Sequence, residues 1–575
     1  MSPETAGDLP PPRAMGDAAL VVDVADATAA RRVADAVRSR MAPRPREVIG
    51  GISSVVVVLA APPGAGDLAQ IAGEIDDFRR RHGAPAGTGA GDGAPSALVV
   101  VPTAFDGPDL DEVAAVAGLD VPSLIGELTG RELTVSAVGF APGFAYLSGL
   151  SPALGAIPRR SRPRSRVPAG SVALAGGFAA VYPRPSPGGW QLVGRTGLRL
   201  FDPTRPPFAL LAPGDRVRFE VASSETPAAG AGDPEADRRP GARRWPGPVS
   251  GPAPDRPALT VETGGFLTTL QDAGRAGQAH LGVPGSGPAD PVAHELANRL
   301  VGNHPGAAAL EVTVRGPTLR FAERALVAAV GGDPELELDG HWAGADRVVP
   351  VEGGQRLQLL GTRSGARSYL AVGGSLDAVG TMGSCATDIL SGLGPPPLQA
   401  GDRLGIGDRP GPPADHVVWS RLAPRYPADG RYVLRVVVGP DHSWFAPGLE
   451  ERLGSVRFAV EADSDRVGLR LAPLEPPGGL ARRPGEVASK GMVTGAVQVP
   501  ESGRPVVLLP DHATLGGYPV VAVVIRADLH LLGQCRPGDE VRFEPVGLDA
   551  AAAAFGALRR SVDGALEGRY PVTPG

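Results

Sequence analysis

Lysine is almost missing from this 575-residue sequence. Lys490 is the single lysine, and the other 55 of the 56 basic residues are arginine. Any reaction that depends on a lysine therefore has one candidate residue. Lys490 lies in Ser-Lys-Gly-Met, with no glycine directly before it as in a phosphate-binding P-loop and no Met-Lys-Met context as in a biotin carrier. We therefore expect neither a P-loop nor biotin on this chain.

Cysteine is also scarce. Cys385 and Cys535 are too few for a disulfide framework and form no CxxC motif, which favours a reducing compartment. The zinc signature HExxH and paired histidines are absent too. We therefore expect no metal ligands from this chain.

Long hydrophobic runs are missing as well. The most apolar short run, from Val55 to Ala61, is far too short to span a bilayer. The first residues lack the basic and apolar segments of a signal peptide. The formal net charge of -6 gives no basic excess that would attract a nucleic acid. We expect a cytoplasmic protein with no membrane or nucleic-acid partner.

Glycine and proline, by contrast, are abundant, at 81 and 62 residues. This abundance favours many turns over long helices. Strand and helix patterns alternate at the start, and short Val-, Leu- and Phe-rich runs follow from residue 97. We predict a mainly β fold with an N-terminal α+β domain. The predicted units are a disordered start (1–15), an α+β domain (16–95), a β barrel (96–222), a Pro/Gly/Ala-rich linker (223–256), a second barrel (257–410), a third barrel (411–548) and a C-terminal helix with a tail (549–575).

Internal repeats support this division. LLAPGDRVRFE is echoed by GQCRPGDEVRFE and more weakly by LQAGDRLGIG, with the aspartates at 215, 539 and 402. Gly-Asp followed by alternating apolar residues indicates a tight turn that leads into a strand. Upstream, SPGGWQLVGRT resembles TLGGYPVVAVV, and VGFAPGFAYLSGL stands where the other copy has VGLRLAPLEPPG. The repeat intervals have the size of domains, so we predict copied closed barrels, which leave no exposed sheet edge.

These motifs resemble a known family. GFAPGFAYLSGL, RSRVPAGSVALAGG and LFDPTRPPFALLAPGDRV resemble the B-type component of prokaryotic 5-oxoprolinase, also called KipI or allophanate hydrolase subunit 1-like. LQDAGRAGQAHLGVPGSGPAD, TGAVQVPESGRPVVLLPDHATLGGYPV and RPGDEVRF resemble the C-type component, which is KipA-like. The resemblance implies tandem cyclophilin-like β barrels, with both components fused in one chain.

The resemblance also implies an activity. The family opens 5-oxo-L-proline to L-glutamate with ATP and Mg²⁺, and its members need a separate A-type subunit of the LamB/YcsF-like kind. A five-membered lactam is a poor electrophile, so its opening needs a phosphate cradle and an acid or base near the ring. The same modules resemble the carboxyltransferase part of urea carboxylase and urea amidolyase, which is an alternative. A third reading is a KipI–KipA-like module that binds a sensor histidine kinase, with Phe140, Phe144 and Tyr146 as an apolar rim.

Candidate site residues lie in the shared motifs. The candidates for catalysis are Gln271, Asp272, Asp290, Asp511 and His512. The candidates for binding the small-molecule substrate or nucleotide are Gly188, Gly189, Arg195, Arg275, Ser286, Gln498, Gly516, Gly517 and Tyr518. We expect the two Gly-Gly turns to occupy equivalent positions and to shape a shared cleft.

Each candidate also has a purely structural interpretation. Asp272 before a Gly suits an Asx turn, and Asp290 before Pro291 suits a helix N-cap. Arg195 is also suited to pairing with a structural carboxylate. Ser286 has no base defined by the sequence, so we do not expect a serine nucleophile.

Two positions depart from the family pattern. Leu128 stands where an alignment by eye places a histidine in many relatives, and Lys490 stands where others are acidic. If the family uses either position in catalysis, this chain is altered or specialised there.

Overall fold

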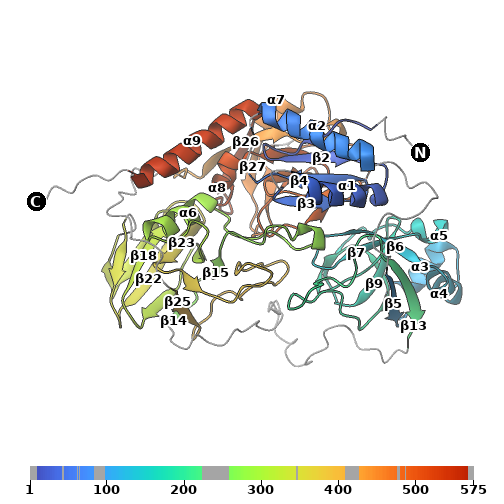
Figure 1. Ribbon diagram of the computed structural model, residues 1–575, viewed down its shortest axis with the longest axis horizontal. Helices are drawn as coiled ribbons and strands as arrows, with labels where there is room; N and C mark the ends of the chain where they lie inside the picture. Colours follow the sequence, from blue (N-terminus) through green and yellow to red (C-terminus); the bar gives the residue numbers. More distant parts are fainter. Residues whose placement is uncertain are drawn as a thin grey trace, which may run out of the picture.

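The computed structural model describes most of the chain, and Figure 1 shows its arrangement. The described residues are 9–41, 45–60, 63, 65–82, 97–222, 258–344, 347–407, 426–475, 479–485 and 487–567. They form an N-terminal domain, a first barrel, a middle unit, a C-terminal barrel and a last helix. The predicted linker at 223–256 lies outside the described residues. Within the described part, no helix is both long and apolar enough to cross a membrane.

The N-terminal domain is an antiparallel sheet of order β1-β2-β4-β3 with two helices. Its elements are β1 (Arg13–Ala14), β2 (Ala19–Asp23), α1 (Ala27–Arg40), β3 (Glu47–Gly50), β4 (Ser54–Val58) and α2 (Ala65–His82). Leu20 and Val22 pack with residues of the helices, whereas Val21 packs with Val520 and Val523 of the C-terminal barrel. Because successive strand side chains point to opposite faces, the sheet is buried on both sides.

The domain begins earlier than the sequence predicts. Arg13 and Ala14 pair with β2, and Met15 is buried in the core. The predicted disordered start at 1–15 is therefore wrong for residues 9–15, which the structure describes. Two residues make too short a strand for a periodic pattern, which is why this segment carries no clear strand signal.

The first barrel consists of seven strands in the order β12-β9-β10-β7-β6-β13-β5. Backbone hydrogen bonds between Ala104 and Arg195, both 2.8 Å, join its two end strands and close it. Its elements, with the flanking hairpin, are β5 (Leu98–Thr103), α3 (Leu110–Ala117), α4 (Val121–Thr129), β6 (Leu133–Val138), β7 (Ala145–Ser148), α5 (Pro152–Gly155), β8 (Arg164–Val167), β9 (Ser171–Ala175), β10 (Phe178–Val181), β11 (Ser186–Gly188), β12 (Gln191–Arg195) and β13 (Arg216–Val221).

The C-terminal barrel repeats this topology. Its closed order β26-β33-β30-β31-β28-β27-β34 matches the first barrel strand for strand, including the parallel pair that β34 makes with β26 and β13 makes with β5. Its elements are β26 (Arg431–Val438), η4 (His442–Trp444), α7 (Leu449–Ser455), β27 (Arg457–Val460), β28 (Gly468–Pro473), β29 (Lys490–Gly491), β30 (Ala496–Gln498), β31 (Val506–Leu508), β32 (Leu515–Gly516), β33 (Val520–Val524), η5 (Arg526–Asp528), α8 (Leu529–Leu532) and β34 (Glu540–Pro545). The predicted duplication of a barrel is confirmed.

The two Gly-Gly turns lie at equivalent positions in the two barrels. Gly188 belongs to β11, which pairs with β8 in a separate two-stranded sheet. Gly516 belongs to β32, which pairs with β29 in the same way. The next strands, β12 and β33, each join the main sheet beside β9 and β30. This equivalence was expected from the echo between the two Gly-Gly motifs.

The middle unit differs from the two barrels. It contains a seven-stranded and a five-stranded sheet, and its strand β25 pairs with β14 in antiparallel rather than parallel fashion. Its elements are β14 (Leu259–Thr263), β15 (Leu267–Gln271), η2 (Ala279–Leu281), α6 (Pro291–Leu300), β16 (Ala309–Thr313), β17 (Thr318–Phe321), β18 (Ala325–Val330), β19 (Pro334–Leu338), β20 (His341–Trp342), β21 (Val349–Val351), β22 (Arg356–Thr362), β23 (Arg367–Val372), β24 (Leu376–Asp377) and β25 (Arg403–Ile406).

The Gly-Asp turn nevertheless recurs in all three β units. Asp215, Asp402 and Asp539 each accept a hydrogen bond from the backbone N–H three residues earlier, at 2.8, 2.7 and 2.7 Å. Each turn leads directly into the last strand of its unit. The weak echo at Asp402 therefore marks a shared turn, although the strand that follows pairs differently.

The stretch Val138–Leu150, which includes β7 of the first barrel, packs against other units. Phe144 and Tyr146 are buried in a cluster shared with the N-terminal domain and the C-terminal barrel, and their rings meet edge to face at 5.2 Å. A Cβ atom at Gly139 would collide with Leu515, which explains the glycine there. The predicted apolar rim for a partner protein is therefore wrong for these rings, because this chain's own units cover them.

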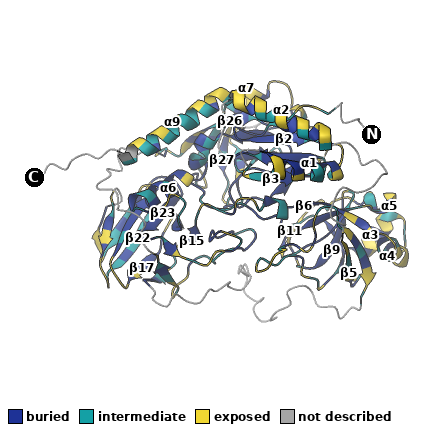
Figure 2. Ribbon diagram, in the orientation of Figure 1, coloured by how far each residue is buried: buried dark blue, intermediate teal, exposed yellow. Residues whose placement is uncertain are grey.

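Helix α9 (Leu548–Glu567) crosses the molecule from the N-terminal domain towards the middle unit (Figure 1). Figure 2 shows that α2 and α9 expose one side to solvent, while the strands beneath them are buried. The predicted C-terminal helix is present at 548–567, and the predicted tail lies outside the described residues.

Candidate functional site

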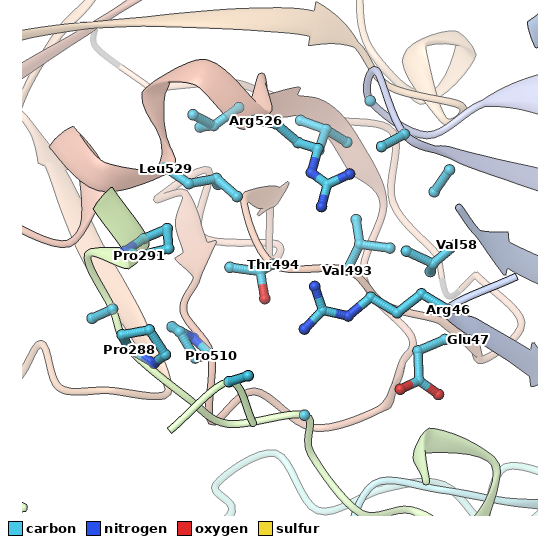
Figure 3. A pocket seen from close by; sticks show the side chains of 18 of the residues that line it. Arg46, Glu47, Val58, Pro288, Pro291, Val493, Thr494, Pro510, Arg526 and Leu529 are labelled. Carbon is cyan, nitrogen blue, oxygen red and sulfur yellow. The ribbon is translucent and has the colours of Figure 1, made fainter. Parts of the chain in front are cut away.

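A cavity of about 470 Å³ lies where four parts of the chain meet (Figure 3). The N-terminal domain, the middle unit, the C-terminal barrel and α9 all contribute to its wall. Cavities of this size at domain junctions are common sites for small molecules. Of the fourteen candidate residues named from the sequence, Ser286 and His512 line it.

The loop Val283–Asp290 presents Ser286 to the cavity. Ser286 has a left-handed backbone, with a φ angle of 52°, which is uncommon for a residue with a side chain. Its N–H donates to the carbonyl of Pro510 at 3.1 Å. Its hydroxyl lies 2.7 Å from a carboxylate oxygen of Asp511 and 3.1 Å from the carbonyl of Thr387. The loop is thus fixed to both the middle unit and the C-terminal barrel.

Asp511 belongs to a buried ion network rather than to the cavity wall. Arg466, with 1% of its surface exposed, donates to both carboxylate oxygens of Asp511 at 3.0 Å. It also donates to Glu311 and to the carbonyl of Gly287 at 2.5 and 2.6 Å. Burial alone would raise the pKa of Glu311, but Arg466 and Arg367 outweigh burial and lower it. A cation thus holds both oxygens of Asp511, and the predicted catalytic role of this residue stays a prediction.

His512 lines the cavity, and its Nε2 has no hydrogen-bond partner among the described residues. Its Nδ1 lies 2.8 Å from the carbonyl oxygen of Ala513, which can only accept, so Nδ1 carries the proton. Burial lowers the pKa of His512, which keeps the ring neutral near pH 7. Nε2 then holds a lone pair. His512 is therefore suited to act as a general base on a water molecule in the cavity.

Gln271, Asp272 and Arg275 form a buried support behind the cavity. Asp272 accepts from the N–H of Gly274 at 2.9 Å, as in an Asx turn, and from the N–H of Cys385 at 2.8 Å. Gln271 and Arg275 donate to carbonyls of the segment 381–387. Nothing in the geometry places these three at the cavity surface, so their catalytic role stays a prediction.

Asp290 is the N-cap of α6. One of its carboxylate oxygens accepts from the N–H of Ala293 at 2.8 Å, and the other accepts from Tyr426 and Gln534 at 2.5 and 2.8 Å. The helix-cap interpretation is confirmed. These bonds occupy both oxygens of Asp290, and its use in catalysis stays a prediction.

The remaining candidates do not line this cavity. Gly188 packs against the hydroxyl of Tyr182, and Gly516 packs against the amide of Gln498. Gly189, Gly517 and the exposed Tyr518 flank these turns, and Arg195 pairs with Asp106 at 3.0 Å. The ligand-binding roles of these seven residues stay predictions.

The two departures from the family pattern are both structural here. Lys490 is buried and pairs with Asp441 at 2.5 Å. Leu128 is buried in the core of the first barrel. Neither residue lines the cavity.

Sequence reasoning missed several residues of the cavity wall. Arg46, Glu47 and Asp17 come from the N-terminal domain, and Arg526 follows β33 of the C-terminal barrel. None of these residues belongs to a sequence motif with the spacing of a binding or catalytic site. Packing between distant segments of the chain brings them together. The buried cation Arg466 was missed for the same reason.

Comparison with known proteins agrees with this layout. Residues 12–211 match the family model "Carboxyltransferase domain, subdomain C and D", and residues 281–545 match "Carboxyltransferase domain, subdomain A and B". Both ranges contribute to the cavity. Helix α9, which lies beyond both matched ranges, adds to its wall.

Among curated proteins, the C-type component of 5-oxoprolinase from Escherichia coli (strain K12) is 35% identical over 306 residues, covering 52% of this chain and 94% of that protein. The B-type component of 5-oxoprolinase from Bacillus subtilis (strain 168) is 46% identical over 125 residues, covering 21% of this chain and 52% of that protein. Urea amidolyase of Lachancea kluyveri is 32% identical over 332 residues, covering 54% of this chain but 18% of that protein. A crystal structure of TTHA0988 superimposes with a TM-score of 0.76 at 33% identity, covering 92% of this chain and 99% of the other.

Proposed function

Because this chain belongs to the family of carboxyltransferase-domain proteins that includes the B-type and C-type components of 5-oxoprolinase, we propose that it is the fused B and C component of an ATP-dependent 5-oxoprolinase. Its reaction would open 5-oxo-L-proline to L-glutamate. One observation supports this most directly: the cavity is built jointly by the B-like N-terminal domain and by the C-like units. A joint site gives a physical reason for keeping both components in one chain.

The proposed chemistry starts from a weak electrophile. Transfer of the γ-phosphoryl group of ATP to the lactam oxygen makes that oxygen a leaving group. Water then attacks the ring carbon and the C–N bond breaks, with the proton going to the nitrogen, which leaves the γ-carboxyl group of glutamate as an acyl phosphate. A second water displaces phosphate, which carries the former lactam oxygen, and L-glutamate remains. His512 Nε2 takes the proton of the attacking water, since Nδ1 is held by Ala513. Ser286, whose hydroxyl is held by Asp511, would orient the ring.

ATP and Mg²⁺ enter this proposal as a co-substrate and its metal ion. Among the described residues, no three His, Cys, Asp or Glu side chains are grouped to hold a metal ion. Mg²⁺ typically keeps several waters and binds substrate phosphates, so the ion would arrive on ATP. The two cysteines are buried and unpaired, which supports a cytoplasmic location.

Reconstitution tests the proposed function. The purified chain, ATP, Mg²⁺ and 5-oxo-L-proline are incubated with and without a separate A-type (LamB/YcsF-like) subunit, and glutamate and ADP are measured. We expect both products when the two proteins are mixed and neither from this chain alone. His512→Gln should lower the rate by about 10²-fold or more, the usual loss with a general base. Mixing that leaves 5-oxo-L-proline intact would contradict the proposal.

A carboxyltransferase function is the second candidate. It is favoured by the matched family models and by the similarity to urea amidolyase. In the same assay, carboxylation of urea or another amide, supported by a separate biotin carrier, would select this function.

A further inference from the structure

Charged side chains surround the cavity, but its carboxylates are already held by groups of the protein. Glu47 accepts two backbone N–H groups of the middle unit, at 2.5 and 3.3 Å. Both oxygens of Glu295 accept from Arg559, at 2.6 and 2.9 Å. Asp17 accepts the backbone N–H of Arg526 at 3.1 and 3.2 Å. The carboxylates of the cavity wall are therefore already bound by N–H groups of the protein itself.

Two guanidinium groups of the wall differ from these carboxylates. The guanidinium of Arg526 contacts neutral groups, the carbonyl of Ala60 at 3.4 Å and the ring of Phe555 at 5.6 Å. Arg46 lies just before β3 of the N-terminal domain, and Arg526 begins η5 of the C-terminal barrel, so they come from different domains. Figure 3 shows both side chains projecting into the cavity. Within the described part of the chain, neither forms an ion pair with a carboxylate. Burial lowers the pKa of Arg526, and the charge of Arg46 lowers it further. Two like charges that share a cavity favour an anion between them.

A buried hydroxyl adds a second, independent signal. Thr514 lines the same cavity and is 1% exposed, and its Oγ1 has no hydrogen-bond partner among the described residues. Buried polar groups are almost always paired, so this hydroxyl at the cavity wall is available to pair with a bound molecule. The side chain of Thr494 also points into the space in Figure 3.

The rest of the wall is apolar. Val58, Val493, Leu529, Pro288 and Pro510 face the cavity in Figure 3. An apolar wall beside two cations suits a small ring that carries an oxyanion. A free inorganic ion has no apolar surface to pack against this wall.

We propose that Arg46 and Arg526 together bind the oxyanion of a small cyclic ligand, with Thr514 donating a hydrogen bond to the same ligand. This deepens the proposed function and rests on it for the identity of the ligand. 5-Oxo-L-proline has the required features, a carboxylate on a five-membered ring. The B-like half then supplies one arm of the anion clamp and the C-like half supplies the other, which makes binding dependent on both halves.

Direct binding tests this assignment without any partner subunit. Isothermal titration of the full chain uses 5-oxo-L-proline, 2-pyrrolidinone (the same lactam without its carboxylate), inorganic phosphate and ATP. Arg46→Gln removes an exposed guanidinium and leaves the core intact; Arg324→Gln is the matched control, since Arg324 lies on the surface away from the cavity. We expect 5-oxo-L-proline to bind, 2-pyrrolidinone to bind at least about tenfold more weakly, and Arg46→Gln to lose about tenfold or more in affinity.

The four ligands and the two variants distinguish the ways in which this proposal can fail. Equal binding of 5-oxo-L-proline to Arg46→Gln and Arg324→Gln would overturn the clamp, even if reconstituted hydrolysis succeeds. Phosphate or ATP binding that depends on Arg46, with no binding of 5-oxo-L-proline, would support the clamp as a phosphoryl site and overturn its carboxylate assignment. Absence of binding by all four probes would overturn the inference outright.

Discussion

Arg466 shows how one residue sets the geometry of the candidate site. It reaches from the C-terminal barrel to Glu311 and to the carbonyl of Gly287 in the middle unit, and it holds Asp511, which in turn holds Ser286. The charged groups Arg466, Glu311 and Asp511 are buried away from water, so the network tolerates no missing partner. The loop of Ser286 therefore depends on a cation outside every recognisable motif.

Replacing Arg466 by Met tests this dependence. The substitution removes the cation that holds both oxygens of Asp511 and leaves Glu311 with Arg367, at 3.4 Å; breaking a buried ion pair typically costs about 3–5 kcal/mol. We expect a correspondingly lower free energy of unfolding in urea titrations. Arg324→Gln, which removes an exposed ion pair with Glu352, should change little. Equal stability of the two variants would show that the network does not hold the units together.

Asp388 predicts a pH dependence of stability. Burial, and then the negative charge of Asp511, raise the pKa of Asp388 to about 6. Between about pH 4 and 6 the native state therefore binds more protons than the unfolded chain, and stability falls as the pH rises through this window. Asp388→Asn removes this contribution. We expect the melting temperature of Asp388→Asn to rise relative to that of the wild type as the pH increases from 4 to 7. A difference between the two melting temperatures that stays constant over this range would contradict the raised pKa of Asp388.

Local residue roles were predictable, and distant ones were not. Asp272 and Asp290 carry their signals in the next one or two residues, a Gly and a Pro, and both form the expected turn and cap. Arg46, Arg526 and Arg466 act across domains. In an arginine-rich sequence nothing local separates them from the solvent-exposed arginines.

At the scale of elements, α9 is the clearest bridging structure. Its residues Leu558 and Val562 pack with α6 of the middle unit, whereas Ala551 packs with Val437 and Ile525 of the C-terminal barrel. Phe555 and Leu558 also line the cavity. One helix thus joins two units and completes the wall of the site.

Val562 provides a test of this bridge. The residue is fully buried against α6, so Val562→Ala removes apolar contacts and should lower the free energy of unfolding by about 1–2 kcal/mol. The exposed position of Arg560 on the same helix allows a matched control, Arg560→Ala, for which we expect almost no change. Differential scanning calorimetry measures both. Equal melting temperatures would mean that the end of α9 is not docked.

The repeats predicted the barrels because turn chemistry is local. The hydrogen bond from the N–H three residues earlier to each Gly-Asp carboxylate recurs at all three positions, as the motif indicates. Strand pairing after the turn is not local: β25 takes an antiparallel neighbour where β13 and β34 take parallel ones. The middle unit therefore shares the turn but not the topology that the motif suggested.

The whole molecule is assembled across its two halves. The sheet of the N-terminal domain covers the C-terminal barrel instead of being confined to the first barrel that follows it in sequence. Ile52 donates to the carbonyl of Ser489 at 3.0 Å, and Arg13 donates to that of Pro440 at 3.1 Å. No sequence pattern marks this arrangement, because each contact joins residues more than four hundred positions apart.

The shared core predicts that the halves stay associated without the covalent link. A protease site inserted between residues 223 and 256 would separate the B-like half from the C-like half. Burial of Val21 against Val520 and Val523, together with the bonds from Glu47 to the middle unit, should hold the cut halves together in gel filtration. Val21→Asp places a charge in this apolar contact and should release the halves after cleavage, whereas the uncut variant should elute as the uncut wild type does. Asp77→Asn, on α2 and outside the contact, serves as the control. Separation of the cut wild-type halves at micromolar concentration would show that the linker, and not the packed core, keeps the cavity assembled.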